Sequence, residues 1–487
     1  MFFQLLEQDH FFLYAFLFAL GLSIPIFGLF AFFVCLLFVF EAIYQIYTTP
    51  FYSKKAFLLF GFILCGFFYG TSSLSFPKNA SFAAICKIAS IQPAKRGYFY
   101  KAHIKKGYDL RGNPVKNMPI TFFKHTLLED VIFCKGAYNE GRCKLKECVA
   151  FSKNTTIKTR FLMKKKVLNR LNSLFEKDVA HLFSALFLGW NLDPTLYLSF
   201  LKCGQGHLLA ISGLHFAFFA MLLLLSFKFL PKKWALVITF AILTLYFLFL
   251  GPSPSIQRAY VTCVFYFLFQ FFNVRISGLN VLGIALLLEL VLHPMHLQSL
   301  GFQFSYGICF FLIVFFKPIR EKIGDRLKLP SKHTLQHYST KDLVGIFLLT
   351  KIRDLFALTL CIQMVTFPLI LFYFNEVSLL YLIYNLFFPF LILICMMLGL
   401  FTLLTGLFGN VCSFFTSQVL DLLLYYPSGF DLRFSYPMPL VLLLSYFVLL
   451  FLLLKKDYRL QPFLRLSKNV LLKLQDRWIL WQFRTKY

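Results

Sequence analysis

The chain has 487 residues, of which 59% are hydrophobic and 14% are charged, and its formal net charge is +28. Soluble globular proteins are about half apolar and a quarter charged, so this composition excludes an ordinary soluble protein. Apolar runs long enough to cross a bilayer recur along the chain. They predict a polytopic α-helical membrane bundle of about 10–12 spans.

The first 74 residues are expected to anchor the chain in the membrane. An apolar stretch from Phe11 to Phe40 is interrupted by glycine and proline, so it forms either one long tilted helix or two short ones. A second apolar run covers residues 56–74. The first stretch is too long for the apolar region of a cleaved signal peptide, which indicates a retained anchor.

Residues 75–166 change character and predict a small inserted β domain. Short alternating segments are separated by Gly, Pro and Asn, as in a sheet of about five strands. The expected strands include Phe82–Ile91, Tyr98–Ile104, Pro119–Lys124 and Asp130–Lys135.

The charge of this region is strongly positive, with 22 Lys and Arg against six Asp and Glu between residues 78 and 177. Cations that follow phosphates, interleaved with aromatic faces for bases, are typical of single-stranded nucleic-acid binding. Attraction to anionic lipid and simple solubility are the alternatives. The candidate DNA-binding residues are Lys95, Arg96, Tyr98, Tyr100, Lys101, Lys105 and Lys106.

Four cysteines of the same region, Cys86, Cys134, Cys143 and Cys148, are disulfide candidates. Four cysteines allow three connectivities. One of them joins Cys143 to Cys148 as a local loop and Cys86 to Cys134 across the sheet. Free buried thiols are the alternative. No cysteine and histidine spacing typical of a zinc site occurs, and no metal or cofactor is expected.

Residues 167–203 are expected to form amphipathic helices at the membrane surface. In Val167–Leu186, apolar residues recur at intervals of three and four, as on one face of a helix. Residues 204–454 form the predicted transmembrane bundle, and residues 455–487 form a basic tail. The expected spans lie at about 207–227, 234–250, 256–272, 278–293, 301–316, 355–374, 377–395, 396–410 and 437–454.

Loop charges predict the orientation. The segment Lys317–Asp354 and the tail are basic and should therefore be cytoplasmic. Counting back across the spans places the β domain outside. The chain is therefore expected to be a multi-pass protein of a bacterial cytoplasmic (inner) membrane.

A polar motif enters the bundle at Gly204-Gln-Gly-His207-Leu-Leu-Ala-Ile-Ser212-Gly213-Leu-His215. His207 and His215 are eight residues apart and share roughly one helix face. Such polar groups at membrane depth are costly and usually face a cavity or a partner helix. We favour a hydrophilic path. The alternatives are hydrogen bonds between helices, a metal site and a Ser/His hydrolase.

Four later spans also carry polar side chains. Together with the motif they give the candidate channel-lining residues, namely His207, Ser212, Gly213, His215, Arg258, Gln303, Ser305, Gln363 and Asn385.

The motif from His207 to His215 resembles the signature of the ComEC competence family, membrane channels for DNA uptake. Further blocks resemble the family in the same order, namely Ser255-Ile-Gln-Arg258-Ala259, Gly301-Phe-Gln-Phe-Ser305, Gln363 with Thr366-Phe-Pro368, and Asn385 with Pro389. The resemblance covers about residues 180–395.

The resemblance implies an OB-like extracytoplasmic domain and a bundle that passes one DNA strand inward. It also implies several partners: a cytoplasmic helicase or DNA-handling protein, an extracytoplasmic DNA receptor and a separate nuclease. Many family members carry a metallo-β-lactamase-like domain. This chain has no His-x-His-x-Asp-His run, so nuclease activity is not expected.

The favoured function is therefore a single-stranded DNA channel rather than an enzyme. No phosphate-binding Gly-x-x-x-x-Gly-Lys-[Ser/Thr] motif occurs, so the energy is expected from a partner helicase or the membrane gradient. A secondary transporter of an anionic solute is the main rival, with Glu289 and Arg258 as its candidate charged pair.

Overall fold

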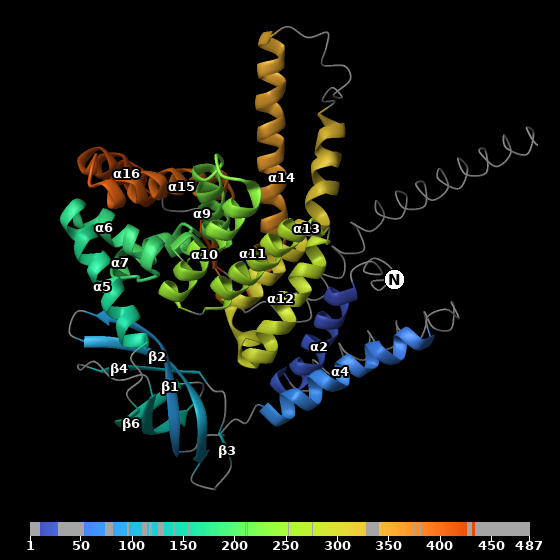
Figure 1. The fold of residues 1–487 in the computed structure, drawn as a ribbon, viewed down its shortest axis with the longest axis vertical. Coiled ribbons are helices and arrows are strands. Elements are labelled where there is room, and N and C mark those ends of the chain that lie inside the picture. The colour runs from blue at the N-terminus through green and yellow to red at the C-terminus, as the bar shows by residue number, and fades with distance from the viewer. Residues whose placement is uncertain are drawn as a thin grey trace, which may run out of the picture. The chain divides into compact units, whose positions relative to one another are not determined.

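The computed structural model describes residues 10–27, 53–73, 81–94, 97–109, 114–115, 119–124, 131–139, 142–152, 156–209, 211, 213–251, 253–274, 276–327, 340–374, 376–378, 381–425 and 431–433. The chain divides into two compact units. One contains residues 1–310 and 383–428, and the other contains residues 311–382 and 429–487. Together they are mostly helical, with one small curled β sheet (Figure 1).

The curled sheet contains six antiparallel strands. These are β1 (Ser81–Ala94), β2 (Gly97–Asp109), β3 (Pro114–Val115), β4 (Pro119–Lys124), β5 (Val131–Asn139) and β6 (Arg142–Ser152). The strand order is β3-β2-β1-β5-β6, and β4 pairs with β2 beside β3. The edge strands β4 and β6 also contact each other, so the sheet curls toward closure.

The inner face of the sheet carries its apolar core. Ile88, Ile104 and Ile132 are each at most 1% exposed, and Tyr100 stacks on Phe122 with ring centres 5.0 Å apart. Alternation along a strand sends neighbouring side chains to opposite faces, so the intervening residues point outward.

The Cys86–Cys134 bridge, one of the connectivities that the sequence left open, is not formed. The register places Cys86 opposite Ile132, whereas Cys134 lies opposite Ala84 in β1 and Cys148 in β6. Cys86 has a buried free thiol. The side chains of Cys143 and Cys148 lie outside the described residues, so other disulfides remain a prediction.

The segment after the sheet was expected as one helix over 167–186. The structure instead has α5 (Thr156–Leu174), α6 (Lys177–Phe183) and the π-helix η2 (Ser184–Leu188). Helix α5 begins before residue 166, the expected end of the β domain. The helices separate at Phe175 and Glu176, where Glu176 has extended backbone as the N-cap of α6. The buried residues of α5, including Ile157, Phe161 and Leu171, belong to one core cluster with those of the sheet.

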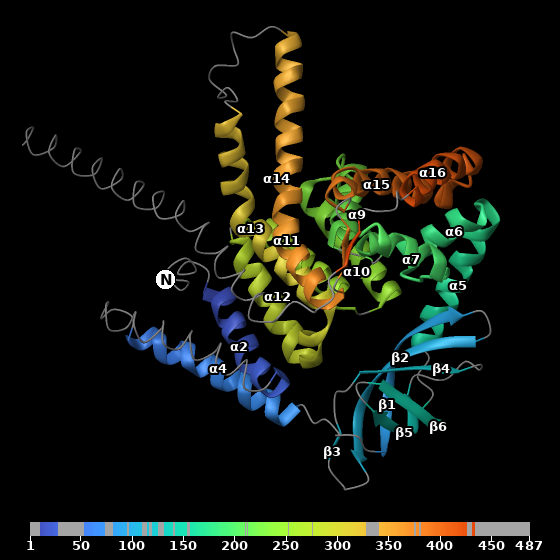
Figure 2. The ribbon, with the colours of Figure 1, turned by 180° about the vertical axis from the view of Figure 1, so that it is seen from behind.

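The N-terminal anchor contains α2 (His10–Phe27) and α4 (Ser53–Ser73), which lie side by side (Figures 1 and 2). Gly21 and Gly66 allow this approach, because a Cβ at either position would overlap the backbone of the other helix. Residues 28–52 lie outside the described residues, so the choice between one or two helices over 11–40 stays open beyond Phe27. Helix α2 also packs against the helix α12 (Gly278–Leu292).

The rest of the first unit is helical. It contains α7 (Pro194–Lys202), α8 (Gly206–Leu209), α9 (Gly213–Ser226), α10 (Lys232–Leu250), α11 (Pro254–Phe272), α12 (Gly278–Leu292), the 3-10 helix η3 (Pro294–Gln298), the start of α13 (Leu300–Arg326), most of α15 (Tyr381–Thr405) and α16 (Gly409–Leu424). Helix α15 is continuous across residues 395 and 396, so the expectation of two separate spans there is wrong. No Gly or Pro stands at that point to end the helix.

The second unit contains the remainder of α13, α14 (Thr340–Phe374) and the short strands β7 (Glu376–Ser378) and β8 (Asp431–Arg433), which pair with each other. Helix α14 begins fifteen residues before the expected span at 355. Much of the predicted basic loop 317–354 is therefore helical.

Four described helical segments are long and apolar enough to cross a membrane, namely 232–250, 300–324, 343–373 and 384–405. Shorter apolar helices cover 11–25, 61–72, 215–226 and 278–292. The protein is a membrane protein, and the expected count of 10–12 spans stays a prediction. Residues 437–454, the last expected span, lie outside the described residues.

Candidate functional site: a basic aromatic sheet face and a polar bundle interior

The outer face of β2 and β4 carries an exposed aromatic pair. Phe99 and Phe123 are register partners, and their rings meet at 5.2 Å and 60°. Their exposed fractions are 55% and 40%, which is high for phenylalanine on a folded sheet. Lys101 follows on the same face, where it lies opposite Thr121 and is also exposed. This arrangement offers ring faces beside a cation.

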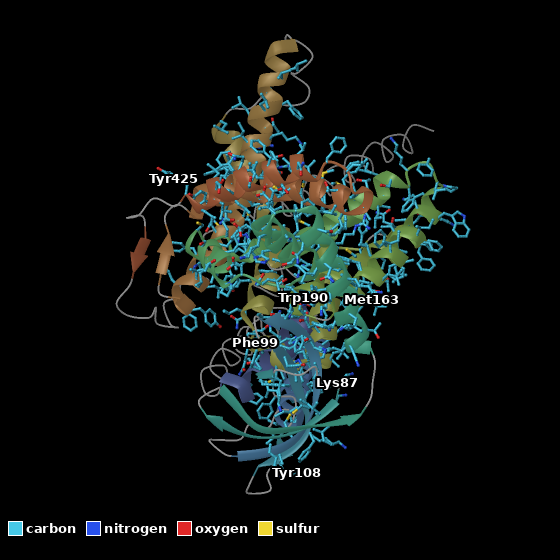
Figure 3. All side chains as sticks on the ribbon, turned by 90° about the vertical axis from the view of Figure 1, so that its left-hand side faces the viewer. Lys87, Phe99, Tyr108, Met163, Trp190 and Tyr425 are labelled. Carbon is cyan, nitrogen blue, oxygen red and sulfur yellow. The ribbon has the colours of Figure 1, made fainter. Side chains whose placement is uncertain are left out.

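The same face of β2 continues to the end of the strand. A register shift in the β1–β2 pairing interrupts the alternation near Lys105, so Lys105 and Lys106 are both exposed. Tyr108 is 63% exposed. Figure 3 shows Phe99 and Tyr108 near opposite ends of the strand. The exposed side chains along β2 are therefore aromatic at both ends and basic between.

Two predicted DNA-binding residues are placed elsewhere. Tyr100 is fully buried against Phe122, so it cannot present its ring to a base. Tyr98 is half-buried and packs edge-on against Phe161 of α5 at 5.5 Å. The available rings are those of Phe99 and Phe123, which the sequence analysis missed. Lys95 and Arg96, between β1 and β2, lie outside the described residues.

The bundle interior of the first unit has a buried arginine at its centre. Arg258 of α11 is 8% exposed; its Nε donates to the Ser305 hydroxyl at 2.6 Å and its Nη1 donates to the Cys309 sulfur at 2.9 Å. Both partners lie one turn apart on α13. Among the described residues, no carboxylate lies within ion-pair distance of Arg258, and both of its described hydrogen-bond partners are neutral.

Gly213, the first residue of α9, lies against this guanidinium. A Cβ added at Gly213 would lie 2.7 Å from Nη2 of Arg258. The glycine thus gives the arginine its space, and the structure brings together three predicted channel residues, Gly213, Arg258 and Ser305.

Other members of the predicted set occupy different surroundings. His215 is buried, whereas His207 is exposed. Ser212 lies outside the described residues, so the Ser/His hydrolase geometry stays untested. Gln303 donates to the Leu297 carbonyl of η3 at 3.1 Å. Gln363 lies in the second unit, where Thr366 donates to its Oε1 at 3.4 Å.

Asn385 of α15 is hydrogen-bonded to Gln205, a residue of the polar motif that was not among the predicted channel-lining residues. Nε2 of the fully buried Gln205 donates to Oδ1 of Asn385 at 3.2 Å. The remaining atoms of these amides, Oε1 of Gln205 and Nδ2 of Asn385, are buried and have no hydrogen-bond partner among the described residues. Such atoms are costly to bury unsatisfied, so they fit a place where a polar molecule passes or binds.

Glu289 of α12 does not pair with Arg258. It is 3% exposed; its Oε2 accepts from the Tyr306 hydroxyl at 2.8 Å and its Oε1 lies 2.9 Å from Nδ1 of His296. The charged pair proposed for the rival transporter is therefore not formed between the two described side chains. Tyr306 and His296 were not predicted. A lone glutamate within the apolar run 278–293 was the available signal.

Helix α5 is tied to the bundle by a buried lysine. Nζ of Lys164 donates to the carbonyls of Leu188 at 2.7 Å and Leu250 at 2.9 Å, which end η2 and α10. It also lies over the rings of Trp190 and Phe249. Burial, with a smaller contribution from Arg160, lowers the pKa of Lys164 to about 7.

The helical region of the chain is similar to known proteins. The profile of the Competence protein family matches residues 188–459, more than half of the chain. ComE operon protein 3 of Bacillus subtilis (strain 168) is 26% identical over 172 residues, which are 33% of this chain and 22% of that protein. The uncharacterized protein MG316 of Mycoplasma genitalium (strain ATCC 33530 / DSM 19775 / NCTC 10195 / G37) is 28% identical over 163 residues, 33% of this chain and 41% of that protein.

Both matches thus cover less than half of the relative's length. No solved structure matches. The family match contains the polar motif, Arg258, Ser305 and Asn385. This chain belongs to the Competence protein family.

Proposed function

We propose that the protein binds single-stranded DNA on the outer face of β2 and β4 and passes it across the bacterial inner membrane through the polar interior of its helical bundle. The exposed Phe99–Phe123 pair beside Lys101 carries the proposal. Base stacking on aromatic side chains contributes about 1–3 kcal/mol per base, and it tolerates any sequence because every base has a ring face.

The strand order supports an OB-like domain. Strand β1 pairs with β2 and β5, β2 pairs with β4, β5 pairs with β6, and β4 contacts β6. OB folds are five-stranded, partly open barrels that bind oligonucleotides on the face of the second and third strands and on two loops. With the two-residue β3 set aside, β2 and β4 are those strands, and Lys95 and Arg96 come between the first two strands in the sequence.

Two contacts support an extracytoplasmic position for this domain. His103 of β2 stacks with His293 at the end of α12, and Lys164 of α5 bonds the end of α10. Loop charges predict that these two helix ends lie outside. Contacts of the sheet and of α5 with these two helix ends are what an extracytoplasmic domain would make, and they support the proposed orientation.

The bundle interior supports a path for phosphates. Arg258 is a buried cation whose described partners, Ser305 and Cys309, are neutral, so no described carboxylate competes with a phosphate for its guanidinium. Three further steps would be functions of separate partners. An extracytoplasmic receptor would capture the DNA, a nuclease would degrade the other strand, and a cytoplasmic helicase or DNA-handling protein would take up the incoming strand.

The proposal is tested by binding of a fluorescent single-stranded oligonucleotide to the purified full chain in detergent. Changing Phe99 and Phe123 together to alanine should weaken binding about tenfold or more, because two stacking faces are lost. Phe229→Ala is the matched control, since Phe229 is 77% exposed in the turn after α9. Equal binding by the double variant and the unchanged chain would contradict the proposal.

A further inference from the structure

Three side chains of the kind that bind metal ions meet where α6 and α7 come together. Asp178 and His181 belong to α6, and Asp193 is the N-cap of α7. One ligand atom of each residue, a carboxylate oxygen or a ring nitrogen, lies within 4.8 Å of the ligand atoms of the other two. Asp178 is exposed, so solutes reach the group from solvent. The DNA path proposed above uses none of these residues.

We propose that Asp178, His181 and Asp193 form a binding site for a divalent transition-metal ion, Zn²⁺ or Mn²⁺, which fastens α6 to α7. Ligand atoms at about 2.0–2.2 Å from one tetrahedral ion lie roughly 3.3–3.5 Å from one another. Nδ1 of His181 and Oδ2 of Asp193 are already 3.8 Å apart. An imidazole together with carboxylates is a donor set that suits these ions, and two carboxylates balance their charge.

The ring of His181 has a buried nitrogen that needs a partner. Its Nδ1 atom is buried and has no hydrogen-bond partner among the described residues. Oδ2 of Asp193, at 3.8 Å, is too distant for a hydrogen bond. Buried polar atoms of native proteins nearly always have a partner, so an unpartnered ring nitrogen beside two carboxylates points to a bound ion.

The charges around the group also favour a cation from solution. The chain has 49 Lys and Arg against 21 Asp and Glu. Even so, no described lysine or arginine lies within ion-pair distance of Asp178 or Asp193. Two carboxylates this close repel each other, and a shared cation removes the repulsion.

The backbone between the two helices holds the ligands in position. The Ser184 hydroxyl lies 2.8 Å from the carbonyl oxygen of His181 and 2.9 Å from that of Trp190, and the Trp190 amide donates to the Ser184 carbonyl at 3.1 Å. Helix α16 packs against both α6 and α7. Only side-chain torsions therefore need to change when an ion binds.

Thr195 orients the carboxylate of Asp193. Oδ1 of Asp193 accepts from the Thr195 amide at 2.9 Å and from the Thr195 hydroxyl at 2.7 Å. These bonds leave Oδ2 on the side of His181. Carboxylates that bind metals are usually held by such outer hydrogen bonds, so Thr195 is a positioning residue of the site.

Helix α7 leads directly into the polar motif of the bundle. The amide of Gln205 donates to the carbonyl of Phe200, near the end of α7, at 2.7 Å. An ion that holds the start of α7 therefore also steadies the segment that carries Gln205. The sequence analysis considered cysteine and histidine spacings, so it did not single out this aspartate-rich set.

The test is Zn²⁺ and Mn²⁺ binding to the purified full chain in detergent at pH 7.5, after treatment with a chelator and with an affinity tag that contains no histidine. Equilibrium dialysis counts the bound ions, and electron paramagnetic resonance reports the surroundings of Mn²⁺. We expect one ion per chain and a higher thermal midpoint when the ion is added.

His181→Gln and Asp193→Asn should each weaken binding at least tenfold. Asparagine is also a good N-cap, so Asp193→Asn should keep the thermal midpoint of the metal-free chain. Should that variant be less stable, His181→Gln decides, because it leaves the cap untouched. Thr195→Val should weaken binding about 10–100-fold, and Thr195→Ser should restore it.

Two matched controls should bind the ion as the unchanged chain does. Asp421→Asn alters an exposed aspartate of α16, and His296→Gln alters a partly exposed histidine of η3. Three results would overturn the assignment: no stoichiometric binding by the unchanged chain, binding that His181→Gln leaves intact, and binding that His296→Gln removes instead. DNA binding is measured on the same preparations, so failure of the metal site and failure of the proposed DNA site are separately visible.

Discussion

Phe99 of β2 and Phe123 of β4 face each other across paired strands, with their ring centres 5.2 Å apart and both rings open to solvent. Two aromatic rings exposed as a pair on a basic sheet are costly for a protein that does not use them. Lys101 on the same face adds a cation for a phosphate. The predictions below follow from this face and from the buried arginine of the bundle.

Lys101 should contribute to DNA binding through charge alone. Lys101→Gln removes one phosphate contact, so affinity for single-stranded DNA should fall across all sequences and the salt slope should decrease by about one counterion. Binding measured over a salt series checks this. The control is Lys232→Gln, an exposed lysine at the start of α10 that lies outside the sheet. An unchanged slope for Lys101→Gln would place the phosphates elsewhere.

Gly213 should tolerate no larger side chain if the guanidinium of Arg258 must stay where it is. Gly213→Ala puts a methyl group 2.7 Å from Nη2, so the arginine has to move away from Ser305. We expect DNA uptake to fall at least tenfold in a transformation assay while the protein accumulates normally. Gly345→Ala is the control, because nothing lies within 4 Å of a Cβ at that position. Equal uptake in both variants would remove Gly213 from the path.

Arg258 should be needed for passage rather than for folding. Its hydrogen-bond partners are the neutral Ser305 and Cys309, so Arg258→Gln leaves no unpaired buried charge behind. Transformation should be lost while the amount of protein in the membrane is unchanged. Thr262→Val, one turn along α11, is the control, since the one hydrogen bond of the Thr262 hydroxyl among the described residues goes to a carbonyl of its own helix. Loss of the protein itself in Arg258→Gln would show a packing role instead.

Lys164 should make stability depend on pH. Its pKa is about 7 in the folded protein, against an ordinary value of 10.5. Between these values the unfolded chain binds a proton that the folded chain lacks, so stability rises with pH from about 7 to about 10.5. Lys164→Met should flatten this rise, by on the order of a few kcal/mol over the whole window. Thermal midpoints in detergent at pH 7 and 9 measure it.

Lys165→Met is the matched control for this measurement, because Lys165 is the exposed neighbour on the same helix. It should keep the pH dependence of the unchanged protein. A steep dependence that persists in Lys164→Met would assign the titration to another group.

The sequence predicted the strands well because alternation and turn residues are local signals. Pro119–Lys124 has the predicted bounds. The sequence did not show which face of β2 is buried, because aromatic residues stand at both odd and even positions of this strand. Lys101 offered the signal: a lysine belongs outside, and Phe99 shares its parity while Tyr98 and Tyr100 do not. The bulge near Lys105 then lets two adjacent lysines point outward.

The apolar runs of the sequence predicted where the helices of the bundle lie, but they did not predict which side chains meet between the helices. Arg258 and Ser305 were both singled out, but a one-dimensional pattern does not reveal that they meet or that Gly213 covers them. The network of Glu289, Tyr306 and His296 joins residues from α12, α13 and η3. Helix packing decides which of these residues meet, and the spacing of polar residues along the sequence carries no information about that packing.

The most direct test places a photoreactive phenylalanine analogue at single positions and irradiates cells during uptake of labelled DNA. The incoming strand should crosslink at Phe99, on the sheet, and at Ser305, beside Arg258. It should not crosslink at Leu245, which is 66% exposed on the apolar helix α10. Crosslinks at Leu245 as strong as at Ser305, or none at either Phe99 or Ser305, would contradict passage of DNA through this protein by the proposed route.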